Sequence, residues 1–456
     1  MSHYLYPLLA HQAQGVKFIL DRWAAGSGAA LFHEMGTGKT YTALTSLVQA
    51  GVQRALVVAP VSVLPVWKRE NQERLTRPFQ VYTADEFSLA VDRGTTDGRA
   101  LLLISYESMW RRVKLLREFR PEAVILDESH RIKSPKAKQS KFAHTLVKIP
   151  KRLALTGTPI AQSPLDAWSQ VRVLDPALLG DSYYAFRNRY AVVEERKLTD
   201  GRRFQKVTSY KNLGELGQRL RQVGHFVTKA EAIDLPPKTH IVRAVQLSAE
   251  ELRAYEAMRK LAVVSLEQER VVTAAHVTTQ LLRLQTLANG WIASQGRIDE
   301  LGSSKLDELG DLLTGELSGQ PTVVFAWFRH DLVRIAAQLA KLGIQYFELT
   351  GDTSAADREK AVAAFQAGER TVFLAQQKVG GYGITLTRAS HVIYYGLTWS
   401  VEAWLQSQDR IHRVGQRWPC TYVYLQAAGT VEEKIYQAVL EKRALAERVT
   451  NWKELF

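Results

Sequence analysis

Short apolar runs recur along the chain, and most are bounded by turn residues. They fall at residues 29–32, 55–59, 101–104, 123–126 and 153–155, and again at residues 322–326, 371–375, 391–395 and 421–425. A short apolar run without polar alternation is typical of a strand that is buried on both faces. Such strands need helices on each side of their sheet. The pattern therefore predicts an α/β fold with two mostly parallel sheets, each covered by helices.

The middle of the chain has a different pattern. From about residue 163 to residue 290 it is mostly helical and charged, as at residues 213–223 and 248–266. The sequence Asp-Leu-Pro-Pro-Lys at residues 234–238 interrupts this region, and two adjacent prolines cannot continue a helix. We therefore predict two domains. Residues 1–234 form the first, with a helical extension from about residue 163, and residues 235–456 form the second, with a helical start to about residue 290.

A glycine-rich stretch, His-Glu-Met-Gly-Thr-Gly-Lys-Thr at residues 33–40, follows the first apolar run and precedes a helical pattern. Glycines let backbone N–H groups approach an anion, and a helix N-terminus adds partial positive charge. Lys39 is placed to reach the outer phosphates of a nucleotide, and the Thr40 hydroxyl can hold Mg²⁺. The stretch predicts binding of a nucleoside triphosphate. The alternative is a glycine turn with a chance lysine.

Two adjacent carboxylates end another apolar run, in the sequence Ile-Leu-Asp-Glu-Ser-His at residues 125–130. Asp127 can hold Mg²⁺ through its water shell, and Glu128 can polarise the attacking water. Hydrolysis of a nucleoside triphosphate requires this division of labour. The alternative is a pair of exposed acids at a strand end, and the upstream Lys39 argues against it.

The charge of the chain indicates a polyanionic partner. Its formal net charge is +14, from 60 Lys and Arg against 46 Asp and Glu. One basic run without any acid comprises Arg131, Lys133, Lys136, Lys138, Lys141, Lys148, Lys151 and Arg152. We predict that this run contacts a phosphate backbone, with a solvated helix face as the alternative. Residues 186–221 carry ten basic residues against four acids, and for them both interpretations stay open.

Other classes of protein are disfavoured. A single cysteine, Cys420, excludes an internal disulfide framework and argues against a cysteine-based zinc site. No apolar run has membrane-spanning length, and the first residues lack the features of a secretory signal. We expect a cytoplasmic protein without a membrane partner. The sequence does not indicate an oligomeric state.

The motifs together resemble those of a known family. Residues 33–40, 127–130 and the sequence Leu-Thr-Gly-Thr-Pro at residues 155–159 resemble ordered motifs of superfamily-two helicases. Residues 380–389 and 406–416 resemble signatures of the Swi/Snf family of helicase-like DNA translocases. Shorter matches at residues 57–67, 105–107, 235–238 and 304–306 extend the resemblance over almost the whole chain. The chain resembles a compact bacterial or phage-type member.

This resemblance implies two RecA-like lobes with ATP between them and Mg²⁺ beside it. The residues implied to bind the nucleotide are Gln12, Gly36, Thr37, Gly38, Lys39, Thr40, Gly383 and Gln406, with Gln12 reading the adenine. The implied catalytic residues are Lys39, Asp127, Glu128, Arg410 and Arg413, and the implied metal ligands are Thr40 and Asp127. Arginines suit the role because negative charge spreads during phosphoryl transfer.

Contact with nucleic acid is expected from both lines of reasoning. The expected residues are Lys136, Lys138, Lys141, Thr156 and Thr387, and the two threonines contact the nucleic acid or relay its presence to the ATP site. For Trp67, Trp327 and Trp399 a packed core position is favoured over base stacking.

Three departures from the family pattern concern coupling and substrate preference rather than hydrolysis. His33 stands where the family usually has Asp. Phe-Val-Thr-Lys at residues 226–229 occupies the place of an arginine pair, and Trp-Ser-Val at residues 399–401 that of Trp-Asn-Pro.

The expected function is an ATPase that binds duplex DNA, moves along it without processive unwinding, and displaces or remodels DNA-bound protein complexes. Two alternatives stay open. One is a helicase that separates strands of DNA or RNA. The other is a non-catalytic nucleic-acid binder with a degenerate ATP site. Arguing against it are the intact Lys39, Asp127, Glu128, Arg410 and Arg413.

Overall fold

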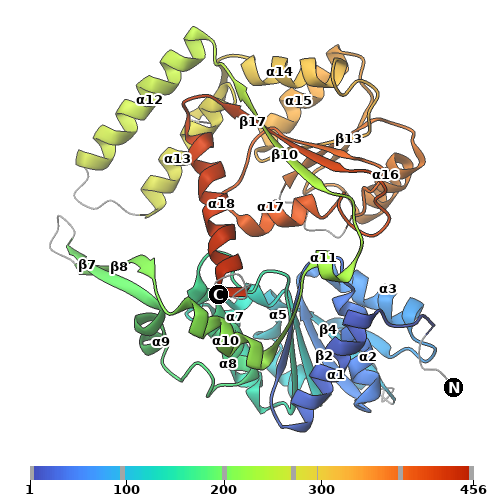
Figure 1. The fold of residues 1–456 in the computed structure, drawn as a ribbon. Coiled ribbons are helices and arrows are strands. Elements are labelled where there is room, and N and C mark those ends of the chain that lie inside the picture. Colours follow the sequence, from blue (N-terminus) through green and yellow to red (C-terminus); the bar gives the residue numbers. More distant parts are fainter. Residues whose placement is uncertain are drawn as a thin grey trace. The chain divides into compact units, whose positions relative to one another are not determined.

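The computed structural model describes residues 5–92, 98–197, 203–268, 274–294, 296–377 and 384–450. The chain divides into two compact units (Figure 1). Unit 1 comprises Met1–Val193, Val207–Asp234 and Lys442–Phe456, and unit 2 comprises Glu194–Lys206 and Leu235–Glu441. Among the described residues, no helix has both the length and the apolar character needed to cross a membrane.

Unit 1 is built on a seven-stranded sheet in the order β3-β4-β2-β5-β6-β1-β9, and all its neighbouring strands are parallel. Its strands are β1 (Ala29–His33), β2 (Arg54–Ala59), β3 (Gln80–Thr83), β4 (Ala100–Ser105), β5 (Ala123–Asp127), β6 (Lys151–Leu155) and β9 (Gly224–Val227). Its helices are α1 (Ala10–Ala24), α2 (Lys39–Gln49), α3 (Leu64–Arg74), α4 (Ala84–Asp92), α5 (Tyr106–Met109), α6 (Val113–Phe119), α7 (Lys138–Thr145), α8 (Ala167–Leu174), α9 (Tyr183–Tyr190), α10 (Leu213–Val223) and α11 (Lys229–Ala232).

Both faces of the unit 1 sheet are buried. Val57 packs in one apolar cluster with Leu44 of α2. Its neighbour Leu56 packs in another with Phe119 of α6. Successive side chains of a strand point to opposite faces, so a strand covered on both sides needs apolar residues at every position. The continuous apolar runs of the sequence follow from this burial.

Unit 2 contains a six-stranded parallel sheet in the order β10-β17-β16-β13-β15-β14. Its strands are β10 (Lys238–Val245), β13 (Thr322–Ala326), β14 (Tyr346–Leu349), β15 (Val372–Gln376), β16 (His391–Tyr394) and β17 (Cys420–Ala427), and a separate antiparallel pair is formed by β11 (Trp291–Ser294) and β12 (Arg297–Glu300). Its helices are α12 (Ala249–Gln268), α13 (Ala274–Ala288), α14 (Ser304–Thr314), α15 (Arg329–Lys341), α16 (Ala355–Ala367) and α17 (Val401–Gln408). Helix α18 (Val431–Thr450) begins in unit 2, and its last residues belong to unit 1.

The predicted fold class is confirmed, since every predicted apolar run forms a strand. The middle of the chain is less uniformly helical than its charge pattern indicated. It contains β9 and β10, and also β7 (Ala191–Lys197) and β8 (Arg203–Tyr210), which form a two-stranded sheet of their own (Figure 1). These strands are short, charged or exposed at a sheet edge, so they lack the apolar run that marks a central strand.

A buried ion pair anchors the first turn of α18 in unit 2. The Lys305 ammonium lies 2.7 Å from Glu432 Oε1, and both side chains are almost fully buried. Asn289 accepts a further hydrogen bond from this ammonium and donates one to Asp331, whose burial raises its pKa to about 7. Losing one partner of such a pair leaves an uncompensated buried charge. Lys305, in the family match at residues 304–306, is therefore a structural residue of this unit.

Helix α10 offers a matched test of packing within unit 1. A methyl group at Gly217 would overlap the backbone carbonyl of Val449 in α18, whereas one at Gly214 would meet no atom within 4 Å. We expect Gly217→Ala to destabilise the protein by about 1–3 kcal/mol, because backbone cannot move aside as a side chain can.

Gly214→Ala should be neutral or slightly stabilising, since alanine is the better helix former. Thermal unfolding of both variants measures the difference. Equal melting temperatures would show that α18 does not pack against α10 in this way.

Candidate functional site

In unit 1 the predicted motifs lie together at the C-terminal ends of the parallel strands. β5, β6 and β1 are neighbours, so the loops that follow them leave the sheet side by side. These loops carry Asp127 and Glu128, the segment 155–159, and the glycine-rich loop 33–40. A Cβ atom at Gly157 would lie 3.3 Å from both the carbonyl of His33 and the amide nitrogen of Met35. The loops after β6 and β1 therefore touch.

The glycine-rich loop has the backbone conformation that its sequence predicts. Gly36 and Gly38 have φ angles of 83° and 82°, in the left-handed region that favours glycine. A side chain at Gly38 would also clash with the amide of Gln12. Gly38 caps the N-terminus of α2, which is eleven residues long, so the loop ends where the helix dipole is positive. The geometry fits a triphosphate.

Gln12 and Lys39 both contact the loop itself in this structure. The Gln12 amide donates to the carbonyl of Thr37 at 3.2 Å, and its oxygen accepts from the N–H of Leu9 at 3.0 Å. The Lys39 ammonium donates to the carbonyls of His33 and Glu34 at 2.9 and 3.2 Å. Adenine reading by Gln12 and phosphate binding by Lys39 stay predictions. Thr40 lies half-buried in the first turn of α2.

Asp127 is a buried carboxylate at the end of β5. One oxygen accepts a hydrogen bond from the Trp67 indole at 2.7 Å, and the other from the Glu128 N–H at 2.9 Å. Burial, and then the charge of Glu128, raise the pKa of Asp127 to about 6, while Trp67 and the Lys39 ammonium act in the opposite direction. A divalent cation would favour the charged carboxylate. Asp127 and the Thr40 hydroxyl are thus oxygen donors that fit Mg²⁺.

Glu128 has the properties of a residue that polarises water. Its φ angle is 52°, a left-handed conformation that costs free energy for a residue with a side chain. Its Oε2 atom is buried and, among the described residues, accepts no hydrogen bond. His130 Nδ1 lies 3.4 Å from this oxygen. Because this contact is longer than an ordinary hydrogen bond, the oxygen can still accept a hydrogen bond from a water molecule.

A chain of contacts leads from Glu128 to the loop after β6. His130 Nδ1 lies 3.2 Å from the Thr156 hydroxyl, which also accepts from the N–H of Thr158 at 3.1 Å. Thr156 is fully buried. Of the two roles predicted for Thr156, direct contact and relay, this geometry favours the relay.

The predicted motifs of unit 2 also come together. The N–H of Leu386 donates to the carbonyl of Arg410, and the Arg413 guanidinium donates to the carbonyl of Ile384. Arg410 is 8% exposed and donates to the carbonyl of Gln406. The Thr387 hydroxyl accepts from Gln366 at 3.0 Å. Gly383 lies outside the described residues.

The basic run of unit 1 divides into surface and structural residues. Lys136, Lys138 and Lys141 are exposed. Arg152 is instead buried, and its guanidinium donates to backbone carbonyls that include those of Ile149 and Leu174. Arg152 therefore cannot be part of the predicted phosphate contact, because its donors hold the chain together.

An aromatic residue on this surface, Trp110, was not predicted from the sequence. The Trp110 ring lies below the Lys138 ammonium and the Arg111 guanidinium, 5.2 and 4.8 Å from its centroid. Trp110 precedes two arginines, which was the available signal. Cation–π contacts hold both charges at one place on the surface.

The second basic segment is partly neutralised within the chain. Arg189 and Arg219 both pair with Glu215, and Arg203 pairs with Glu195. These pairs favour the interpretation of a solvated surface for the residues involved.

Two tryptophan positions follow the predicted preference for packing. Trp67 is fully buried and Trp399 packs half-buried against the main apolar cluster of unit 2, while Trp327 is half-buried. The hydrogen bond from Trp67 to Asp127 was not predicted, because no local pattern reveals a partner 60 residues away.

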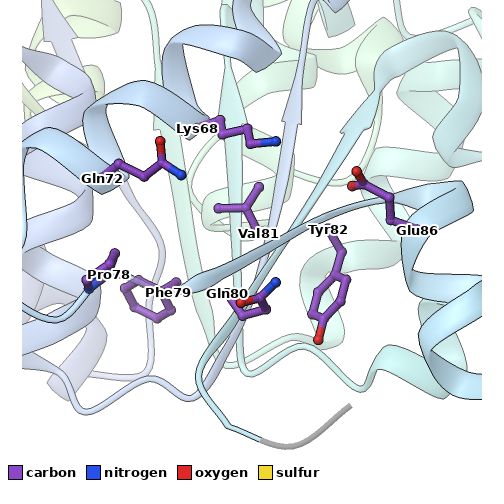
Figure 2. A pocket seen from close by; sticks show the side chains of 8 residues that line it. All are labelled: Lys68, Gln72, Pro78, Phe79, Gln80, Val81, Tyr82 and Glu86. Carbon is purple, nitrogen blue, oxygen red and sulfur yellow. The ribbon is translucent and has the colours of Figure 1, made fainter. Parts of the chain in front are cut away.

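A cavity of about 520 Å³ opens at another place in unit 1 (Figure 2). It is lined by residues of α3, the segment before β3, β3 itself and α4, namely Lys68, Gln72, Pro78, Phe79, Gln80, Val81, Tyr82 and Glu86. β3 is one edge of the sheet, and four strands separate it from β1. The cavity is therefore distinct from the glycine-rich loop and the acidic pair.

Comparison with known proteins identifies the family. A profile of the SNF2-related domain matches residues 11–290, and one of the helicase conserved C-terminal domain matches residues 304–415. The chain belongs to the SNF2 family. The match to the helicase conserved C-terminal domain supports the expected assignment to helicase-type ATPases.

Individual relatives align over almost the whole chain. DNA repair and recombination protein RAD54B of Gallus gallus is 27% identical, over 97% of this chain and 54% of the relative. An uncharacterized ATP-dependent helicase of Mycoplasma pneumoniae is 28% identical, over 96% of this chain and 42% of the relative. The SNF2-family chain thus spans about half the length of these curated relatives. A solved SWI2/SNF2 ATPase core of Sulfolobus solfataricus in complex with dsDNA is 25% identical, with a TM-score of 0.46, over 99% of this chain and 95% of that one.

Substitution of Glu128 tests the division of roles in the acidic pair. In this SNF2-family chain, Glu128→Gln should keep ATP affinity but lower turnover by about 100-fold or more, because the amide cannot take a proton from water. Nucleotide binding and steady-state hydrolysis measure the two effects. Glu118→Gln, an exposed change on α6, is the matched control. An ATP affinity that falls as far as turnover would contradict the assigned role.

Proposed function

We propose that this SNF2-family chain binds double-stranded DNA and uses ATP hydrolysis to move along the duplex and displace or remodel the complexes bound to it. The names of relatives support a DNA substrate, among them a DNA repair and recombination protein and a chromodomain-helicase-DNA-binding protein 1-like of Mus musculus, which is 29% identical over 97% of this chain and 50% of the relative.

One structural observation carries the proposal. The basic helix α7 is hydrogen-bonded to the turn Ser129–Ile132, which directly follows Glu128. The Ser140 hydroxyl donates to the carbonyl of Ile132 at 3.0 Å, and the Gln139 amide donates to the carbonyl of Arg131 at 2.9 Å. A helix that contacts phosphates through Lys138 and Lys141 would thus be held directly against the loop that polarises water. This connection supports hydrolysis that responds to bound DNA.

The proposed chemistry follows from the charges at the site. Lys39 and the N–H groups of the glycine-rich loop hold the outer phosphates, and Glu128 orients a water and accepts its proton. Mg²⁺ held by Thr40 and Asp127 would neutralise charge on the phosphate oxygens. We assign to Arg410 and Arg413 the further positive charge that stabilises the negative charge on the phosphates during hydrolysis.

A strand-separating helicase is the second candidate, favoured by the helicase name of the Mycoplasma pneumoniae relative. Both candidates hydrolyse ATP, so the form of nucleic acid that stimulates turnover distinguishes them.

ATP turnover should rise several-fold with blunt duplex DNA and less with single-stranded DNA or duplex RNA, because the proposed track is an intact DNA duplex. Steady-state hydrolysis with each nucleic acid measures this, and Lys39→Ala controls for contaminating ATPases. Stimulation by single strands or RNA alone would favour the helicase. A lack of stimulation by duplex DNA would refute the proposal.

Neutralising the exposed lysines of the basic run tests the DNA surface. Lys136→Gln, Lys138→Gln and Lys141→Gln together should weaken duplex binding similarly for all sequences. Each lost phosphate contact should reduce the slope of log affinity against log salt by about 1, because fewer counterions are released.

Fluorescence anisotropy across a salt series measures the slope. The control replaces three exposed lysines of unit 2, Lys341, Lys360 and Lys434, with glutamine, for the same loss of charge. An equal effect of both triple variants would mean that only net charge matters and that α7 is a solvated surface.

A further inference from the structure

Three histidines from three elements of unit 1 meet beside the glycine-rich loop. His33 ends β1, His225 lies on β9, and His11 lies on α1. The Nε2 atom of His33 is 2.8 Å from Nδ1 of His225. The His33 and His11 rings meet edge to face, with centroids 6.2 Å apart. His11 Nε2 in turn lies 2.8 Å from the carbonyl oxygen of Thr37 in the loop.

The surroundings fix the His33 ring in place. His33 is fully buried. A Cβ atom at Gly15 would lie 3.3 Å from Cε1 of His33, so the ring fills the space that this glycine leaves between α1 and β1. On the other side, the His225 ring packs against Phe18 of α1 at 5.8 Å. A ring packed in this way can transmit a change in shape or charge to its neighbours.

Hydrogen-bonding rules assign the protons. A carbonyl only accepts, so His11 donates from Nε2 to Thr37. His33 Nδ1 is buried and has no hydrogen-bond partner among the described residues. A buried N–H without an acceptor costs more than a bare lone pair, so His33 carries its proton on Nε2 and donates to His225 Nδ1.

Burial, with a smaller contribution from neighbouring groups, keeps His33 neutral. Burial, followed by the neighbouring His225, Lys39 and His11, lowers the pKa of His33 to about 2. Burial also lowers the pKa of His225, with His11 acting in the same direction and Glu231 in the opposite one. The hydrogen-bonded pair of His33 and His225 is therefore uncharged at neutral pH.

We propose that His33 is a positioning residue of the ATP site. Its ring packs against His11 and keeps His11 in place, so that His11 and Gln12 together hold the carbonyl of Thr37. Fixing this carbonyl sets the peptide between Thr37 and Gly38, at the start of the phosphate-binding backbone. The proposal rests on the assignment of residues 33–40 as the ATP site.

The affinity of the full chain for a fluorescent ATP analogue, measured without DNA, tests this role. His33→Leu keeps the bulk of the side chain but removes its hydrogen bond to His225. It should weaken binding of the ATP analogue about fivefold, which corresponds to the loss of one ordinary hydrogen bond. His33→Gln should restore most of the affinity, because its amide can donate in place of Nε2. The kcat at saturating ATP should change less than the KM.

The matched control is His144→Leu. His144 is another partly buried histidine of unit 1, on α7, and its Nε2 atom lies 2.9 Å from the Ser169 hydroxyl of α8. It should leave analogue binding unchanged. Equal melting of the two leucine variants would exclude a general loss of structure as the cause.

His33→Asp gives a readout that packing alone cannot produce. The new carboxylate raises the pKa of His225, so the pair is neutral at low pH and carries one negative charge at high pH. Analogue affinity relative to wild type should therefore improve as the pH falls from about 8 to about 6. This variant also tests the proposal if His33→Leu fails to fold.

Two results would overturn the inference. One is a folded His33→Leu protein with wild-type affinity, and the other is a His33→Asp protein whose affinity relative to wild type does not change with pH. Lys39→Ala tests the assignment of the ATP site separately from the role of His33. If that variant binds the analogue as wild type does, the assignment of the ATP site is wrong, whatever the histidine variants show.

Discussion

The turn between β1 and α2 is the constraint on which the rest of the site depends. The chain must leave a buried strand and enter a helix within a few residues, and it does so with Gly36 and Gly38 at positive φ. Two side chains of α1, those of His11 and Gln12, donate hydrogen bonds to the carbonyl of Thr37 and so fix the turn. This arrangement places the N-terminus of α2 and Lys39 together at the C-terminal end of β1.

Parallel topology brings the other groups to that turn. Because β5, β6 and β1 are adjacent, Asp127, Glu128 and the segment 155–159 must lie beside the loop. The electrostatic interaction of Lys39 with Asp127 reflects this proximity. Burial makes the carboxylate of Asp127 costly to ionise, and the buried oxygen of Glu128 accepts no hydrogen bond from the described residues. Both groups are therefore in an environment that a cation, a water and a phosphate chain would complete.

The same loop connects chemistry to the surface. The turn after Glu128 is bonded on one side to the basic helix α7 and, through His130, to Thr156 on the other. A shift of α7 on binding a polyanion would therefore move the turn that directly follows the acidic pair. Physical connection of this kind permits coupling between two sites, and the strength of the coupling is a separate quantity.

Sequence reasoning predicted the features that local patterns encode. The central strands were predicted because burial on both faces demands apolar residues at every position. β9 and β10 were missed, because a strand of four residues and an exposed edge strand carry no such signal. The glycine-rich loop and the acidic pair were found from short motifs.

Partners that are distant in sequence could not be found in this way. The hydrogen bond of Trp67 to Asp127 and that of His33 to His225 depend on which strands become neighbours. Arg152 was misjudged for the same reason, since a buried arginine that binds carbonyls looks in sequence like any surface charge.

Displacement of a third strand from a DNA triplex measures movement along an intact duplex. We expect the protein, with ATP and Mg²⁺, to release the third strand from a blunt duplex while the duplex strands stay paired, and we expect Lys39→Ala to release none. Separation of the duplex strands, or ATP hydrolysis stimulated by DNA without release of the third strand, would contradict movement along an intact duplex.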